Sequence, residues 1–244
     1  MSLTPSNPKG TRDFLPAVLS KRNYILEIIK YNFRLFGFLE IETPALENNS
    51  TLLGKYGNEG DRLVFKILNS GDKIKKADIK ALKESNLNDF SKSISSKGLR
   101  YDLTVPLARF VAQHQNELVF PFKRYQIQNV WRADRPQHGR FQEFTQCDAD
   151  VIGSKSIIQE IELIKLYDSV FSQLGFNNLI FKINHRSILA ALAIYIGAES
   201  KLNDFISIID KIDKIGLENV IKEVKNLINN VSVSKLSSLL SEKD

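Results

Sequence analysis

The sequence predicts an α+β fold in which an antiparallel sheet is flanked by helices and followed by a helical segment. Strand-like stretches occur before and between helical ones, without the regular strand–helix alternation of a parallel sheet. Two of them, 122–134 and 140–153, are separated by a short turn that contains Pro and Gly. After His185 no strand pattern is clear, and apolar residues recur at helical spacing. We therefore expect a domain boundary there, between residues 1–184 and 185–244.

The first part of the chain predicts an extended arm, a long helix and two strands. Residues 1–16 are rich in Pro and Gly and indicate the arm. Apolar residues at helical spacing predict a helix over 20–36, which a glycine ends. "FLEIETPAL" (38–46) alternates as a strand, and Pro44 places it near an edge or at the strand's end. "RLVFKIL" (62–68) predicts a second strand, ended by turn residues.

The middle of the chain is more varied. Residues 72–98 are rich in Lys and Ser and indicate a long, mobile, partly helical loop. "LRYDLTVPLARFVAQH" (99–114) begins as a strand and becomes helical near its proline, which suits a first turn. Residues 156–176 have the spacing of an amphipathic helix with Ser156 as N-cap, although a start one or two residues earlier fits equally. "NLIFKIN" (178–184) predicts another strand.

Composition excludes some classes of function but does not identify one. The chain has 244 residues and a net charge of +6, which permits a polyanionic partner such as nucleic acid but does not require one. The single cysteine, Cys147, excludes an internal disulfide and fits a reducing, cytoplasmic compartment. The opening "MSLTPSNPKGTRDFLP" lacks the apolar core of a signal peptide, and no run of eighteen apolar residues predicts a membrane span.

Several familiar sites are not indicated. The sequence contains neither a Walker phosphate loop nor the glycine fingerprint of a Rossmann dinucleotide site. Its three histidines, His114, His138 and His185, are scattered without the spacing of metal ligands, so no metal site is expected. No G-x-S-x-G motif supports a serine nucleophile.

The stretch "RADRPQHGRFQEF" (132–144) raises the first functional hypothesis. Pro136 argues against a helix and Gly139 tolerates a turn, so the arginines are expected near the tip of a hairpin. An arginine held by a rigid sheet offers a planar fork for phosphate or carboxylate. A solvated hairpin with weak surface ion pairs is an equally compatible interpretation.

Two strands offer polar faces. Gln146, Asp148 and Asp150 alternate on one face of "TQCDAD", opposite Thr145 and Cys147. The face is either exposed to water or part of a polar pocket, where carboxylates need cationic or donor partners such as a ligand's amino group.

"RYDLT" (100–104) repeats the theme. Arg100, Asp102 and Thr104 alternate on one face, opposite Tyr101 and Leu103. One sheet that presents acids and arginines could bind a zwitterion and a triphosphate together. The pattern alone does not establish that these strands are neighbours.

These stretches closely resemble histidyl-tRNA synthetases, which have the class II aminoacyl-tRNA synthetase fold. "KGTRDFLP" is similar to the N-terminal arm of the family, and "GFLEIETPALE" to motif 1. "LRYDLTVPLARFVA" is similar to a histidine-binding segment, and "VWRADRPQHGRFQEFTQCDADVIG" to motif 2 and the strand after it. The resemblance covers residues 8–184, so residues 1–184 would be the N-terminal part of the catalytic domain. Residues 185–244 resemble, more weakly, the start of the helical insertion of bacterial members.

The resemblance implies a role for each motif residue. Arg132 would bind the α-phosphate of ATP and the histidine carboxylate, as the catalytic residue. Other residues would contact ATP (Asp134 at the adenine amino group, Phe144 stacked on the ring, Arg140 at the γ-phosphate), the tRNA acceptor end (Arg135, Gln137) and the amino group and neighbouring parts of histidine (Asp102, Leu103, Thr104, Gln146, Asp150).

The implied activity is that of a histidine–tRNA ligase, with histidine, ATP with Mg²⁺ and tRNA(His) as partners, acting as a homodimer. The second histidine-specific segment, motif 3 and the anticodon-binding domain are not found in the sequence. The chain therefore resembles an N-terminal fragment with an incomplete sheet, and we expect weak ligand binding and poor activity from it. One alternative is the synthetase-like regulatory subunit of ATP phosphoribosyltransferase, against which the motif 2 arginines argue. Another is a dimerisation or tRNA-binding module without chemistry.

Overall fold

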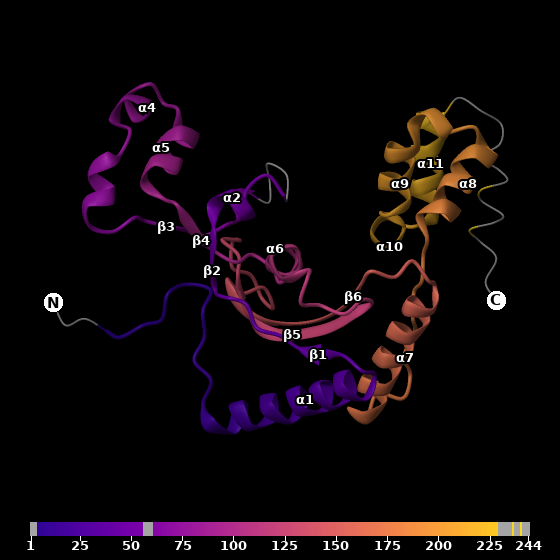
Figure 1. Cartoon of the computed structure of the whole chain (residues 1–244). Helices are drawn as coiled ribbons and strands as arrows, with labels where there is room; N and C mark the ends of the chain where they lie inside the picture. Colours follow the sequence, from indigo (N-terminus) through magenta and orange to yellow (C-terminus); the bar gives the residue numbers. More distant parts are fainter. Residues whose placement is uncertain (1–3, 56–60, 229–235, 237–239, 241–244) are drawn as a thin grey trace. The chain divides into compact units, whose positions relative to one another are not determined.

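The computed structural model describes residues 4–55, 61–228, 236 and 240. The chain divides into two compact units, Met1–Leu179 and Ile180–Asp244, whose elements are labelled in Figure 1. The assignment of the two parts to a catalytic domain and a helical insertion stays a prediction. Among the described residues, no helix is long and apolar enough to cross a membrane.

The main sheet of the first unit is built on one long hairpin. Strands β5 (Phe122–Trp131) and β6 (Glu143–Ile152) pair antiparallel over their full length, which confirms the predicted hairpin. The short strand β1 (Leu39–Glu40) joins β5 in parallel, so the order is β1-β5-β6 and the sheet is mixed, not wholly antiparallel. A parallel neighbour is possible here because more than eighty residues separate β1 from β5, enough for a crossover.

A second, smaller sheet lies near α6 (Thr104–His114) in Figure 1. Strands β2 (Leu46–Asn48), β4 (Lys97–Leu99) and β3 (Lys66–Ile67) pair antiparallel in the order β2-β4-β3. The prediction of one strand over 38–46 is therefore wrong, because the stretch divides between two sheets. Its first residues pair with β5 and its last with β4, and Pro44, which has no N–H, falls in the break.

Two helices cover the apolar face of the main sheet. Helix α1 (Pro16–Leu35) starts four residues before the predicted Ser20, with proline at its first turn. Helix α7 (Ile158–Gln173) has Ile157 at its N-cap, one residue beyond the predicted Ser156. Together with the sheet the two helices bury one apolar core, which consists of Phe33, Phe38, Tyr125, Leu166 and Val170.

The lysine-rich stretch 72–98 contains more regular structure than predicted. It forms the 3-10 helix η1 (Gly71–Lys76) and the helices α4 (Ile79–Lys83) and α5 (Leu87–Ile94), which confirms its partly helical character. Side chains before each α-helix supply the caps. The Asp78 side chain accepts a hydrogen bond from Ala81 N at 2.9 Å, and that of Asn86 accepts one from Asp89 N at 3.2 Å. The predicted mobility of the stretch stays a prediction.

Helix α6 (Thr104–His114) begins where a strand was predicted to continue. Strand β4 ends at Leu99, so a common strand face for Arg100, Asp102 and Thr104 is wrong. A buried ion pair ties α6 to β2, because Arg109 Nη2 lies 2.6 Å from Glu47 Oε1.

The strand predicted over 178–184 is also absent, because residues 176–185 belong to no helix or strand. A strand needs a neighbour to receive its backbone hydrogen bonds, and no described strand pairs with this stretch. Its apolar side chains Ile180 and Ile183 are exposed instead.

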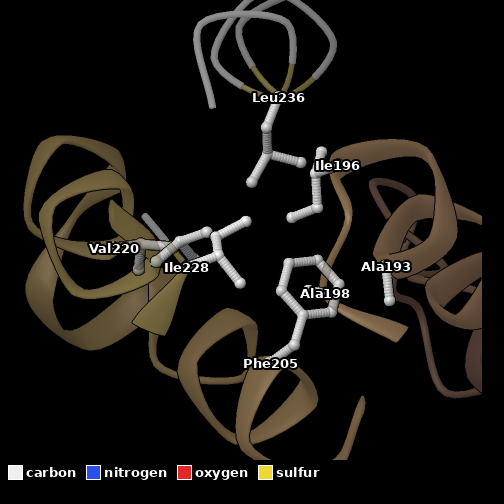
Figure 2. Close-up of a cluster of buried hydrophobic side chains, with 8 residues drawn as sticks. Ala193, Ile196, Ala198, Phe205, Val220, Ile228 and Leu236 are labelled. Atoms are coloured by element: carbon white, nitrogen blue, oxygen red, sulfur yellow. The ribbon is translucent and has the colours of Figure 1, made fainter. Parts of the chain in front are cut away.

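The second unit is helical in its described residues, as the sequence predicts. It contains α8 (Arg186–Ile196), η2 (Glu199–Lys201), α9 (Leu202–Ile209), α10 (Ile212–Ile215) and α11 (Leu217–Leu227). Figure 2 shows Ile196, Phe205, Ile228 and Leu236 pointing toward a common centre. The unit thus has an apolar core of its own.

Replacing Phe205 by alanine should unfold the second unit selectively. The ring is fully buried, and such truncations cost about 3–5 kcal/mol. The only tryptophan, Trp131, lies in the first unit, so its fluorescence should report an unchanged transition while circular dichroism shows earlier loss of helix. Ile194→Ala, at an exposed position of α8, is the control and should change stability by less than about 1 kcal/mol. Loss of both signals together in Phe205→Ala would contradict the expectation.

Candidate functional site

One face of the β5–β6 hairpin is polar. The predicted placement of Gln146, Asp148 and Asp150 on one face of a strand is confirmed, since β6 runs through all three. Cross-strand register sets polar partners from β5 against them, in the pairs Arg124–Asp150, Gln126–Asp148 and Gln128–Gln146. Arg124 and Gln126 are fully buried, whereas Gln146, Asp148 and Asp150 are half-buried, so water reaches this face on β6 only in part.

Arg124 is the buried cation of this face. Its Nη2 lies 2.6 Å from Asp150 Oδ2, and its Nη1 donates to Gln126 Oε1 at 3.4 Å. Burial lowers the pKa of Arg124, and the charges of Asp150, Asp148 and Asp102 oppose that shift. Three carboxylates therefore lie within electrostatic reach of one guanidinium.

The pKa of Asp148 shows the energetic cost of bringing these carboxylates together. Burial raises the pKa of its carboxyl, and the negative charges of Asp150 and Asp102 raise it further. The positive charge of Arg124 and a hydrogen bond from Gln146 lower it, without cancelling the increase. The acids thus carry more negative charge than the one cation neutralises, and a bound cation would relieve them.

Gln146 has hydrogen-bonding capacity left over. Its Nε2 donates to Asp148 Oδ2 at 3.4 Å, whereas its buried Oε1 accepts no hydrogen bond from the described residues. Buried polar atoms are nearly always paired, so this oxygen suits a donor on a ligand.

Arg100, predicted to share a face with Asp102, is structural. It is buried, and its Nε donates to Asn129 O at 2.8 Å. Its Nη1 donates to Thr43 O at 2.7 Å and to Gln128 Oε1 at 2.8 Å. The residue joins the segment after β1, the segment after β4 and strand β5 at the border of the polar face.

The three residues before and at the start of α6 have different surroundings. Asp102 Oδ1 accepts hydrogen bonds from Thr104 N and Val105 N, both at 3.1 Å, and so caps the helix. Leu103 is fully buried, while Thr104 is exposed at the first helical position. The electrostatic influence of Asp102 on Arg124 and Asp148 places it near the polar face, although it lies outside any strand.

Arg132 stands where β5 ends and the loop begins. Its Nε donates to Tyr101 O at 3.1 Å. The guanidinium carbon lies 4.4 Å from the centre of the Tyr101 ring and 5.1 Å from that of Phe144. Two aromatic rings and one backbone oxygen thus hold the planar fork at the end of the polar face.

The loop 132–142 carries the remaining predicted residues. Gln137 and Arg140 exchange backbone hydrogen bonds of 3.2 and 3.0 Å around Gly139, whose φ is +76°. The side chains of Arg135, Gln137 and Arg140 are exposed near this turn, as predicted, and Asp134 is half-buried.

Sequence reasoning missed Arg124, Gln126 and Tyr101. The alternation of Arg124, Gln126 and Gln128 in "KRYQIQ" was a visible signal, since it mirrors "TQCDAD" on the next strand. For Tyr101 no local signal existed, because its contact with Arg132 joins segments that only the fold brings together. Among the described residues, no group of three or more His, Cys, Asp or Glu side chains could hold a metal ion.

Comparison with known proteins defines the class first. The crystal structure of histidyl-tRNA synthetase from Nostoc sp. PCC 7120 matches the whole chain with a TM-score of 0.79 and 27% identity, and the match covers 50% of that chain. A structure described as an ATP phosphoribosyltransferase regulatory subunit/histidyl-tRNA synthetase from Bacillus halodurans has the same fold over 98% of this chain and 63% of its own, with a TM-score of 0.65 and 21% identity. The fold is that of the class II aminoacyl-tRNA synthetases.

Sequence similarity then gives the family. The family model described as histidyl-tRNA synthetase matches residues 81–243. The histidine–tRNA ligase of Christiangramia forsetii is 61% identical over 225 residues, which cover 92% of this chain and 49% of the relative. The chain belongs to the histidyl-tRNA synthetase family, and it spans about half the length of the curated relatives it matches.

Two neutralising substitutions on the polar face should act in opposite directions. The pKa of Asp148 is raised in the folded protein, so the free energy of unfolding falls as the pH rises above 3.8, the ordinary pKa of the carboxyl. Asp148→Asn should therefore raise the melting temperature at pH 7, and the gain should vanish near pH 3. Asp150→Asn removes the charged partner of a buried cation and should cost about 3–5 kcal/mol. Thermal denaturation between pH 3 and pH 8 checks both, and a loss of stability in Asp148→Asn at pH 7 would contradict the account.

Proposed function

We propose that this protein is a histidine–tRNA ligase, which activates histidine with ATP and transfers it to tRNA(His). The observation that carries the proposal is the cluster of three carboxylates around buried Arg124, with Arg132 at the end of the same sheet face. A site with excess negative charge beside an arginine fork is complementary to an amino acid, whose ammonium and carboxylate need opposite partners. The family and the naming of a relative at 61% identity support the same activity.

In the proposed complex, the sheet binds the amino acid. Asp102, Thr104, Gln146 and Asp150 receive the ammonium group and neighbouring parts of histidine. The free Oε1 of Gln146 accepts from a ligand donor. Asp150 also lies against Arg124, which fixes its carboxylate before a ligand arrives. Leu103 has a buried side chain and contributes through its backbone and packing.

ATP is proposed to lie over the end of the hairpin. Arg132 binds the α-phosphate together with the histidine carboxylate, and the adenine stacks on Phe144 with its amino group near Asp134. Exposed Arg140 reaches the γ-phosphate. Because the described residues hold no cluster of metal ligands, Mg²⁺ is proposed to enter bound to the polyphosphate.

The proposed reaction has two steps. The histidine carboxylate oxygen attacks the α-phosphorus of ATP, which forms histidyl-adenylate and releases pyrophosphate. The terminal ribose hydroxyl of the tRNA then attacks the histidyl carbonyl, and AMP leaves. The side chains of this chain orient both reactants and counter the charge at phosphorus, and none of them forms a covalent bond.

The other partners follow from the same proposal. Arg135 and Gln137, exposed at the loop, contact the acceptor end of the tRNA. The protein acts in the cytoplasm, as a homodimer joined through the motif 1 region. Exposed apolar side chains at the end of α1 and in β1, namely Tyr31, Leu35 and Leu39, support such an interface.

The regulatory subunit of ATP phosphoribosyltransferase is the second candidate. The structure from Bacillus halodurans, at 21% identity, supports only a common fold. The loop arginines Arg132, Arg135 and Arg140 favour the ligase, since a subunit without adenylate chemistry needs neither triphosphate nor tRNA contacts.

The amino-acid site can be tested by isothermal titration of the chain with histidine and with a non-hydrolysable histidyl-adenylate analogue. Gln146→Ala should weaken binding about tenfold, because it removes one hydrogen bond in a buried site. Asp102→Asn keeps the oxygen that caps α6 but removes the charge, and it should weaken binding at least as much. Gln115→Ala, an exposed position at the end of α6, is the matched control.

Equal histidine affinity in Gln146→Ala, Asp102→Asn and the control would contradict the assignment of the polar face. Histidine-dependent exchange of pyrophosphate into ATP, measured on the same protein, separates the two candidates. A regulatory subunit binds histidine without exchange, so detectable exchange, even at the low rate expected of a chain that spans about half the length of its relatives, favours the ligase.

The proposed dimer predicts a mass of twice 27.8 kDa in sedimentation analysis. Leu39→Asp places a charge in the proposed apolar interface and should weaken association by about 2 kcal/mol or more, which is roughly thirtyfold in the dissociation constant. Leu87→Asp, at an equally exposed leucine in α5, should leave association unchanged. An equal effect of both substitutions, or a wild-type monomer at micromolar concentration, would contradict the interface.

A further inference from the structure

We propose that the extended arm before α1, residues 8–14, is a clamp that fixes the loop 132–142, with Gly10 and Arg12 as positioning residues. The inference rests on the proposed function, because that loop carries the arginines assigned to the polyphosphate and the tRNA. The arm and the loop are more than a hundred residues apart in the sequence. Backbone hydrogen bonds and a cation–π contact nevertheless join the two segments.

The backbone of the arm is bonded to the end of the loop. Gly10 O accepts hydrogen bonds from Gln142 N at 2.8 Å and from Glu143 N at 3.4 Å. Gln142 in turn holds the other side of the loop. Its O accepts from Arg132 N at 2.9 Å, and its Nε2 donates to Asp134 O at 2.9 Å. One glutamine therefore links the arm to both strands of the loop's base.

Only glycine fits at position 10. Its φ is +82°, a region that side chains disfavour. A Cβ there would lie 2.7 Å from Gln142 Cγ and 3.0 Å from Pro136 Cγ, so the arm's backbone packs directly on the loop. A neighbouring turn holds this conformation, because Thr11 N and Thr11 Oγ1 both bond to Pro8 O, at 3.1 and 2.8 Å.

Arg12 forms a second contact between the arm and the loop, because its side chain packs on the ring of Phe141. Its guanidinium carbon lies 3.3 Å from the centre of the Phe141 ring and 5.1 Å from that of Phe14. From α1, Arg22 covers the other side of the same arm. Its guanidinium lies 4.0 Å from the Phe14 ring, and its Nη2 donates to Thr145 Oγ1 at 3.0 Å. The arm is thus fastened to α1 and β6 at its root and to the loop at its tip.

This arrangement bears on the polyphosphate more than on histidine. The amino-acid site is built on β5, β6 and the start of α6, all held by their own hydrogen bonds. In the described part of the chain, the backbone hydrogen bonds at the loop tip are those between Gln137 and Arg140. A loop that must be ordered on binding loses affinity in proportion to the conformers it gives up, and the clamp removes that loss beforehand. Arg132, which is assigned to both ligands, is also held by Tyr101 and Phe144, so disrupting the arm should lower affinity for ATP more than affinity for histidine.

The first measurement is amide hydrogen exchange in the 244-residue chain, which needs no ligand. In Arg12→Ala, exchange at Gln142 and Glu143 should be about three- to fivefold faster, the range expected for one exposed cation–π contact. Gly10→Ala should accelerate the same amides at least tenfold. Gly37→Ala is the matched control, because Gly37 has a φ of +78° with nothing within 4 Å of an added Cβ. It carries the same backbone strain without the clash and should leave the loop amides unchanged.

The second measurement is calorimetric titration of the same variants with ATP and with histidine separately. The dissociation constant for ATP should rise at least threefold in Arg12→Ala and more in Gly10→Ala, with a smaller rise for histidine. Unaltered exchange at Gln142 and Glu143 in Arg12→Ala overturns the clamp, whether or not ligands bind. Faster exchange with unaltered ATP affinity overturns the positioning role. A wild-type chain that binds no ATP refutes the nucleotide part of the proposed function, while the exchange result still decides the clamp.

Discussion

The fold of the first unit depends on one buried cation. Arg124 lies fully enclosed in the centre of the polar face, where an unpaired guanidinium would cost several kcal/mol. Its compensation requires Asp150 directly across the hairpin, and this register in turn fixes the other nine pairs of β5 and β6. A slip by one residue would place Arg124 opposite an apolar neighbour and turn every polar side chain toward α1 and α7.

The same ten-residue strands therefore serve two purposes. Side chains of one parity, such as Tyr125, pack with Phe33 and Leu166 and hold the helices to the sheet. Side chains of the other parity gather charge at a stability cost, as the raised pKa of Asp148 indicates. A protein that buries like charges on one face must recover that cost elsewhere, and the apolar core on the opposite face is where this unit recovers it.

The parts of the structure that the sequence predicts well are those decided locally. Alternation in "KRYQIQNVW" and "TQCDAD", with Pro136 and Gly139 between them, was enough to predict the hairpin and the shared face of Gln146 and Asp150. The sequence-based predictions are wrong where a segment distant in the sequence determines the local structure. The stretch 38–46 divides because β5 and β4 each take a part of it, and 178–184 stays irregular because no described strand lies beside it. Alternation predicts a strand at Asp102. Its carboxylate instead accepts hydrogen bonds from the backbone at the start of α6, and an alternating pattern carries no information about such local bonds between side chain and backbone.

In the proposed function, the division between sheet and loop separates two recognition problems. A small ammonium group needs partners fixed to within a fraction of an ångström, and the paired strands of the hairpin would hold them so. A flexible polyphosphate and a large RNA need side chains that extend beyond the sheet, so their partners stand on a loop. Such a loop is precise only if something outside the hairpin restrains it. Arg132, at the boundary, is held by Tyr101 and Phe144, whereas Arg140 lies at a turn closed by its backbone pairing with Gln137. Under the proposed function, restraint from the N-terminal arm at Gln142 would let one hairpin place both kinds of group in a single site.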